Sequence, residues 1–136
     1  MSIDEIGYFR VARSAAAFSD NPEHRIGAVV CNKKPLGVGF NQWEKSNPRV
    51  KAALPGRQKR LHAEMHACQG LSEAELKGGS LYVVRLSPAG NVRLASPCQE
   101  CLDFLAKAGI RKIYYSKDSQ EFGKLRYRGN SWEKMI

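Results

Sequence analysis

Short apolar runs rich in β-branched residues alternate with segments of helical spacing along this chain, and this alternation limits its fold more than any other feature. A hairpin is expected over 26–40, where Asn32 and Pro35 lie between two such runs. Strands that alternate with helices imply a central sheet covered by helices on both faces, the α/β class. The expected strands are 26–31, 36–40, 80–86, 92–94 and 111–115, and the expected helices are 4–18, 61–71, 72–76 and 96–108.

The end of the chain indicates a mixed sheet. A parallel strand after Tyr115 would need a crossover of about a dozen residues or more, so a strand near 122–128 is expected to return antiparallel. Ser96 is suited to cap the helix that follows it, and Gly109 to end that helix. We therefore expect a three-layer α/β/α fold around a mixed sheet of about five strands.

The length of 136 residues fits one compact domain covering 1–136, because this is the commonest domain size. No apolar run approaches the roughly 20 residues that span a bilayer, so no membrane partner is expected. The first residues carry Asp4 and Glu5 and lack the basic start of a signal peptide, which predicts a cytoplasmic protein. Cytoplasmic cysteines are ordinarily thiols or metal ligands rather than disulfides.

The net charge of +9 is unevenly distributed along the chain. Residues 45–60 carry six cations and no acid, and residues 111–136 carry a net charge of +4, whereas the other segments are close to neutral. The segment 41–60 also has two prolines, a glycine and no clear period, so a long loop is expected there. An anionic partner is expected to meet this basic loop.

Two short motifs supply a set of metal ligands. His62-Ala63-Glu64 stands at the start of one expected helix, and Pro97-Cys98-Gln99-Glu100-Cys101 stands at the start of another. One imidazole and two thiolates make three tetrahedral ligands and leave a fourth position open, which is typical of catalytic zinc. We expect one Zn²⁺ per chain, held by His62, Cys98 and Cys101.

An open position on zinc admits a water molecule whose pKa the metal lowers toward about 7. Glu64 lies two residues beyond His62, too close in sequence to share the metal comfortably, yet placed to move protons. It is the expected catalytic residue, taking the proton of the water and passing it to the substrate.

These motifs, in this order, resemble the cytidine and deoxycytidylate deaminase superfamily. The resemblance runs from the expected hairpin to the strand ending at Tyr115. It implies hydrolytic deamination of a nucleobase, most simply cytosine to uracil in a free nucleoside or nucleotide. It also implies that Ala63 backs the base, that Asn41 contacts the sugar, and that the protein forms a dimer or a larger homo-oligomer. The turn at 87–96 is an addition to the usual family pattern.

Several other residues carry alternative interpretations. His66 is assigned to substrate-side polarity or packing rather than zinc, because the zinc-protease pattern has Glu directly after its first histidine. Cys31 and Cys68 are expected to be buried apolar groups. Trp43 is a candidate for stacking on a base, and Arg60 for contacting a phosphate.

Two further functions compete with a small-molecule deaminase. A deaminase of single-stranded RNA or DNA would use the basic loop 45–60 and aromatic stacking, for which the candidates are Trp43, Tyr114, Tyr115, Tyr127 and Trp132. A non-catalytic, zinc-stabilised nucleic-acid-binding module is the other alternative, and it gives Glu64 no purpose. The shared metal chemistry leaves cytosine, adenine and guanine open as the target base.

Overall fold

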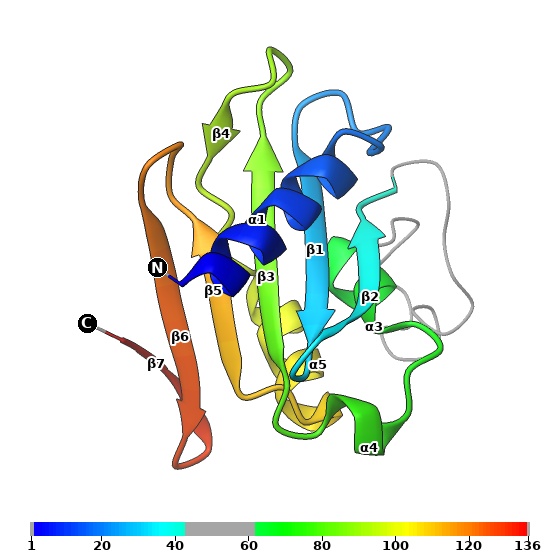
Figure 1. Ribbon diagram of the computed structural model, residues 1–136, viewed down its shortest axis with the longest axis vertical. Helices are drawn as coiled ribbons and strands as arrows, with labels where there is room; N and C mark the ends of the chain where they lie inside the picture. The colour runs from blue at the N-terminus through cyan, green and yellow to red at the C-terminus, as the bar shows by residue number, and fades with distance from the viewer. Residues whose placement is uncertain (1, 43–61, 136) are drawn as a thin grey trace.

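The computed structural model describes residues 2–42 and 62–135 of the chain (Figure 1). The expected helices and strands are present, with small shifts at their ends. The elements in chain order are α1 (Ile3–Ala16), β1 (Arg25–Cys31), β2 (Pro35–Phe40), α3 (Ala63–Cys68), α4 (Glu73–Leu76), β3 (Ser80–Leu86), β4 (Val92–Arg93), α5 (Gln99–Ala108), β5 (Lys112–Ser116), β6 (Phe122–Arg128) and β7 (Ser131–Lys134).

The strands form one mixed sheet of seven strands in the order β2-β1-β3-β5-β6-β7, with β4 paired to β3. β3 and β5 run parallel, and the other pairs are antiparallel. The expected hairpin and the antiparallel return of β6 are confirmed. The sheet exceeds the expected five strands because β6 and the C-terminal β7 continue it beyond β5.

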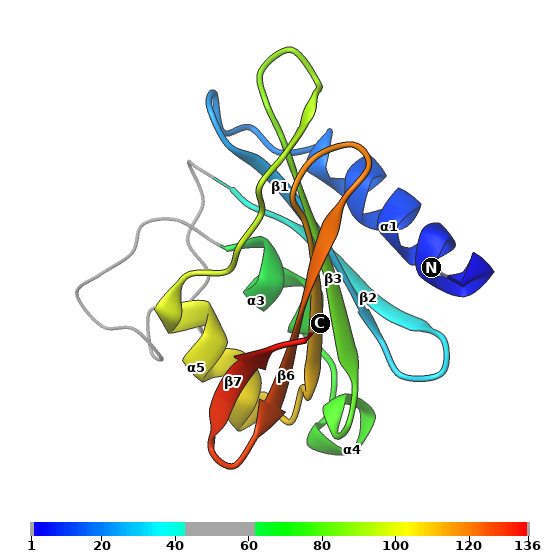
Figure 2. The same cartoon turned by 90° about the vertical axis from the view of Figure 1, so that its left-hand side faces the viewer.

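Helices cover both faces of the sheet, as the α/β class requires (Figure 2). Side chains alternate between faces along each strand. In β3, Leu81 and Val83 pack in the core beneath α3 and α5, whereas Tyr82 and Val84 pack in the core beneath α1. The runs of buried residues in β1 and β3 follow from this two-sided cover.

Two helices begin or end differently from the expectation. The backbone N–H of Ala95 donates to the C=O of Ser116 at 2.8 Å, which keeps the chain extended beside β5. The N-cap of α5 is therefore Cys98, and the assignment of Ser96 as the cap was wrong. Gly109 ends α5 in the left-handed conformation with φ 103°, as expected. α3 is shorter than the expected 61–71, because Gln69 turns extended after Cys68.

α3 approaches β2 closely because β2 presents glycine to it. A Cβ built on Gly39 would lie 2.4 Å from the backbone nitrogen of Ala67 and 2.6 Å from the backbone oxygen of Ala63. A Cβ on Gly37 would lie 2.1 Å from the backbone oxygen of Ala67. These alternate glycines fix the distance between the sheet and the helix that carries the candidate site. No helix in the described ranges is long and apolar enough to cross a membrane.

Candidate metal centre and active site

Two helix N-termini bring the expected ligands together. His62 is the N-cap of α3 and Cys98 is the N-cap of α5, and both have extended backbone. In neither case does the N-cap side chain hydrogen-bond to the first turn of its helix. Cys101 lies one turn into α5 and is fully buried, whereas Cys98 is exposed. The imidazole and both thiols are therefore directed to one another across the gap between two helices.

The distances suit a zinc ion. The ligand atoms of His62, Cys98 and Cys101 all lie within 4.8 Å of one another. His62 Nδ1 and Cys101 Sγ are 3.4 Å apart. Tetrahedral Zn–N and Zn–S bonds of about 2.1 and 2.3 Å would place these two atoms about 3.5 Å apart. Within the ranges that the structure covers, this is the one group of three or more candidate ligands, so the donor set fits a metal with an open fourth position.

The two thiols share their protons unequally. Hydrogen bonds with Cys101 and then with His62 lower the pKa of Cys98 to about 4, although partial burial opposes this. The same hydrogen bond with Cys98, together with burial, raises the pKa of Cys101 well above its ordinary value. The pair thus contains one thiolate at neutral pH, and a divalent cation would favour loss of the second proton.

Glu64 lies in the first turn of α3, two residues from His62, and is only 4% exposed. Burial raises the pKa of its carboxyl group above the ordinary value, while its own backbone N–H and the nearby His62 oppose the rise. A carboxyl group with a raised pKa takes up and releases a proton closer to neutral pH. This is the behaviour required of a proton shuttle.

A cavity of about 370 Å³ opens over these groups. Its volume lies within the roughly 300–1,000 Å³ of small-molecule sites. The floor includes His62, Ala63, Glu64 and Cys98. The rest of the wall consists of Asn21, His24, Ile26, Asn41, Gln42, Arg85, Leu94, Ala95 and Ser96.

Asn41 lines the cavity and also holds its wall together. Its Oδ1 accepts from the backbone N–H of Ile26 at 2.9 Å and from the hydroxyl of Ser19, and its Nδ2 donates to the C=O of His24 at 2.7 Å. One N–H of the amide remains for a ligand. The expected sugar contact stays a prediction.

The other expected substrate residues have different positions. Ala63 is fully buried and lines the cavity, and its expected contact with the base stays a prediction. His66 is not among the residues that line the cavity: its Nδ1 accepts from the backbone N–H of Phe40 at 3.0 Å, and the two rings meet edge to face. His66 therefore holds β2 against α3, and a contact with substrate stays a prediction. Trp43, Arg60 and the basic loop 45–60 lie outside the described residues.

Sequence reasoning overlooked Arg85, which lines the cavity from the end of β3. The signal was present in the period of two: Leu81 and Val83 face α3 and α5, so the next residue in that series, Arg85, must face the same side. The sequence predicted a strand over 80–86, but its side chains were not assigned to the two faces, and Arg85 was therefore not considered.

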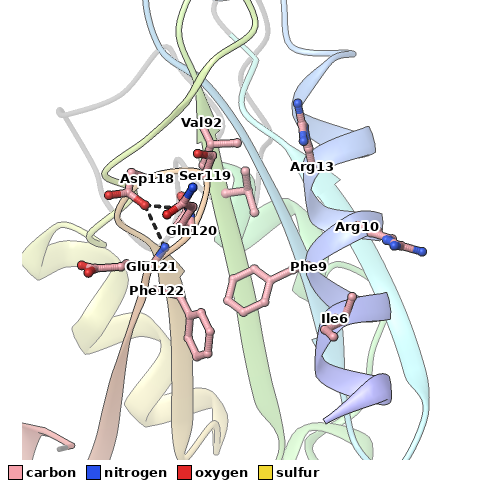
Figure 3. A pocket seen from close by; sticks show the side chains of 12 residues that line it. Ile6, Phe9, Arg10, Arg13, Val92, Asp118, Ser119, Gln120, Glu121 and Phe122 are labelled. Atoms are coloured by element: carbon pink, nitrogen blue, oxygen red, sulfur yellow. Dashed lines mark hydrogen bonds between the residues drawn. The ribbon is translucent and has the colours of Figure 1, made fainter. Parts of the chain in front are cut away.

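A second cavity, of about 170 Å³, lies between α1 and the β5–β6 turn (Figure 3). Phe9 and Phe122 form its apolar wall, with ring centroids 5.1 Å apart. The carboxylate of Asp118 accepts from the backbone N–H groups of Gln120 and Glu121, which closes the turn above it. Neither a thiol nor an imidazole lines this cavity, so the metal chemistry belongs to the larger one.

Comparison with known proteins gives one family and a consistent set of relatives. The model of the cytidine and deoxycytidylate deaminase zinc-binding region matches residues 3–117. The deoxycytidylate deaminase of Mycobacterium phage D29 is 28% identical over 129 residues, which cover 82% of this chain and 93% of that protein. The deoxycytidylate deaminase of Mus musculus is 27% identical over 124 residues, and the match spans 63% of that longer protein.

Solved structures share the fold at low sequence identity. The apo dCMP deaminase of cyanophage S-TIM5 has a TM-score of 0.61 at 21% identity, and 88% of each chain is covered. The same enzyme in complex with dCMP and dUMP has a TM-score of 0.58 at 21% identity, with 83% of this chain and 81% of that chain covered. A mutant cytidine deaminase from Mycobacterium tuberculosis has a TM-score of 0.51 at 20% identity and covers 83% of this chain and 84% of its own.

Proposed function

Since the chain belongs to the cytidine and deoxycytidylate deaminase family, we propose that it is a zinc-dependent enzyme that converts cytosine to uracil in a free nucleoside or nucleotide by hydrolysis. One observation carries the proposal: His62, Cys98 and the buried Cys101 converge beside the buried carboxyl group of Glu64, and all of these residues except Cys101 line a single cavity. A structural zinc site would be closed by a fourth protein ligand and would not need an adjacent proton-transfer group.

The residues of the chain divide the work. Zinc, when bound, supplies the Lewis acidity that brings the pKa of a water molecule from roughly 15.7 toward about 7. Glu64 accepts a proton from the attacking water and delivers protons to the ring nitrogen and to the departing amine, which leaves as ammonia. Ala63 forms the apolar floor against which the base lies, and the burial of Glu64 limits access of bulk water to its carboxyl group.

The family relatives favour a nucleotide over a nucleoside. The proteins from phage D29 and from mouse are both named deoxycytidylate deaminase, and the S-TIM5 enzyme was crystallised with dCMP and dUMP. We therefore propose dCMP as the first substrate to test. Assembly into a homo-oligomer and a cytoplasmic location remain predictions from the sequence.

The competing proposal of a strand-binding deaminase loses support from the aromatic residues. Tyr114 stacks on Tyr82 with ring centroids 4.5 Å apart, and Tyr115 is buried. Trp132 donates from Nε1 to the C=O of Leu102 at 3.0 Å and packs edge to face against Tyr127. These rings are engaged within the protein. Trp43 lies outside the described residues.

The experiment is a turnover screen of the zinc-loaded protein. Ammonia release is measured with cytidine, deoxycytidine, CMP, dCMP, AMP, GMP and a cytosine-containing oligonucleotide, with Glu64→Gln as the matched inactive control. Turnover of dCMP that is absent in the control supports the proposal. Turnover of a purine nucleotide alone, or of no compound, would contradict it. Turnover of the oligonucleotide alone, with steep salt dependence, would favour the strand-binding enzyme.

A further inference from the structure

Among the described residues that line the active-site cavity, Arg85 is the one with a permanent positive charge. It lies near the end of β3 on the same face of the sheet as Leu81 and Val83, which pack beneath α3 and α5. The cross-strand partner of Arg85 on β1 is Ile26, which lines the same cavity. The cation and the carboxyl group of Glu64 therefore line one cavity.

The guanidinium group of Arg85 is poorly satisfied by the protein. Its Nε is buried and has no hydrogen-bond partner among the residues that the structure describes. Its Nη1 donates to the C=O of Leu94 at 3.5 Å, which is the weak limit of a hydrogen bond. Across residues 2–42 and 62–135 it forms no ion pair with a carboxylate. A partly buried cation that keeps spare donors favours an anionic ligand.

A second arginine lies directly beside it. Arg93 of β4 is the register partner of Arg85, and the next residue along this ladder, Val92, packs in the core on the α1 side. Since neighbouring residues of a strand face opposite sides, Arg93 faces the same side as Arg85. Like charges directly opposite each other destabilise a sheet, so a pair of this kind needs a reason.

Arg93 and the turn of the β3–β4 hairpin lie in the segment 87–96, which the sequence indicates to be an addition to the usual family pattern, and Arg85 lies two residues before it. The turn between them is closed by the backbone N–H of Ser87 donating to the C=O of Asn91 at 2.8 Å and that of Gly90 donating to the C=O of Ser87 at 2.9 Å. This ordered turn fixes the register that makes Arg93 the cross-strand partner of Arg85, and Leu94, the residue after Arg93, lines the cavity.

We propose that Arg85, with Arg93 at the rim, binds the phosphate of a nucleotide substrate and selects nucleotides over nucleosides. The inference rests on the proposed function, which places the base at Glu64. It adds the residue that binds the phosphate, at the opposite end of the nucleotide from the base. A guanidinium fork matches two phosphate oxygens, and binding of a dianion between two arginines removes their mutual repulsion. This proposal assigns a phosphate contact to the β3–β4 hairpin, whereas the contact expected from the loop 45–60 lies outside the described residues and stays a prediction.

Binding to a protein that cannot turn over substrate tests the inference directly. In a zinc-loaded Glu64→Gln background, the affinities for dCMP and for deoxycytidine are measured by calorimetry for Arg85→Gln, Arg85→Lys and Arg93→Gln. Arg128→Gln is the matched control, because this substitution removes the same charge. Arg128 is exposed beside the β6–β7 turn, at the far end of the sheet from the β3–β4 hairpin (Figure 1). Thermal unfolding and zinc content are recorded for each variant.

Arg85→Gln is expected to weaken dCMP binding by about 10-fold to 100-fold, and at least tenfold more than it weakens deoxycytidine binding, because a charge-assisted hydrogen bond is lost. Arg85→Lys keeps the charge without the fork and should fall between this variant and the parent. Arg93→Gln should weaken dCMP binding by roughly threefold to tenfold, and Arg128→Gln by less than twofold.

Equal weakening for both ligands, or an unchanged affinity for dCMP in both Arg85 variants, would overturn the inference. If Arg85→Gln does not fold, Arg85→Lys and the exposed Arg93→Gln decide the question. Turnover separates this inference from the proposed function. Arg85-dependent binding of dCMP without ammonia release by the parent enzyme would refute the deaminase alone, whereas deamination of dCMP that does not depend on Arg85 would refute the phosphate site alone.

Discussion

Replacement of Gly39 by alanine should damage the active site from the opposite side of the helix that carries it. The new Cβ would lie 2.4 Å from Ala67 N and 2.6 Å from the backbone oxygen of Ala63, whereas ordinary contacts begin at 3.4 Å. Both clashing atoms belong to the backbone, so no change of rotamer relieves them. α3 must therefore withdraw from β2 by roughly 1 Å, taking His62 and Glu64 with it.

Two effects follow from this displacement. Overpacking costs about 1–3 kcal/mol, and the backbone contacts place Gly39→Ala at about 3 kcal/mol or more. For a domain of this size, that lowers the midpoint of thermal unfolding by roughly 10 °C. A 1 Å misplacement of catalytic groups costs about 100-fold in rate, so kcat for dCMP should fall by about that factor in the protein that remains folded.

Gly7→Ala is the matched control, because Gly7 lies within α1 and a Cβ there meets nothing within 4 Å. Alanine in a helix interior should stabilise the protein by about 0.5–1 kcal/mol and leave kcat unchanged. Calorimetric unfolding and steady-state deamination of both variants measure the two effects. A Gly39→Ala protein that unfolds within about 2 °C of the parent and retains full turnover would refute the claim that the glycines of β2 set the position of α3.

Three further outcomes are expected. Glu64→Ala should keep its fold and zinc while losing turnover by several orders of magnitude, since each proton-transfer step contributes about 10²-fold to 10⁴-fold. Appreciable turnover of this variant, measured by ammonia release, would exclude proton transfer by Glu64. The Cys98→Ala, Cys101→Ala double variant should lose the single zinc measured by elemental analysis, and full retention of zinc would refute the ligand assignment. Burial raises the pKa of Cys31 and Cys68 to about 12 from 9.0, so the folded state keeps two protons that the unfolded chain loses. The contribution of these two protons to the free energy of unfolding should be complete below pH 9 and disappear as the pH rises from about 9 to 12. Denaturant titrations across this range measure the fall in the free energy of unfolding with pH. A Cys31→Ala, Cys68→Ala variant should show a smaller fall.

Local features of the chain were predictable because neighbouring residues alone cause them. The apolar run in 80–86 and the turn residues of 26–40 predicted the strands, and Gly109 predicted the end of α5. The metal ligands were recognisable for the same reason, since their spacing and their positions at helix starts are properties of short segments. The start of α5 was misplaced because a contact with Ser116, distant in the sequence, holds Ala95 extended.

Interactions between distant segments decided the rest. His66 was assigned to packing or to substrate-side polarity, and the hydrogen bond to Phe40 that holds it forms only when α3 packs on β2. Arg85 entered the cavity because the sheet placed it on the face that α3 covers, beside Arg93. The sequence by itself determined the elements, the ligands and the proton-transfer group. The tertiary structure alone determined the shape and charge of the cavity, because its walls are assembled from strands and helices whose pairing no short segment encodes.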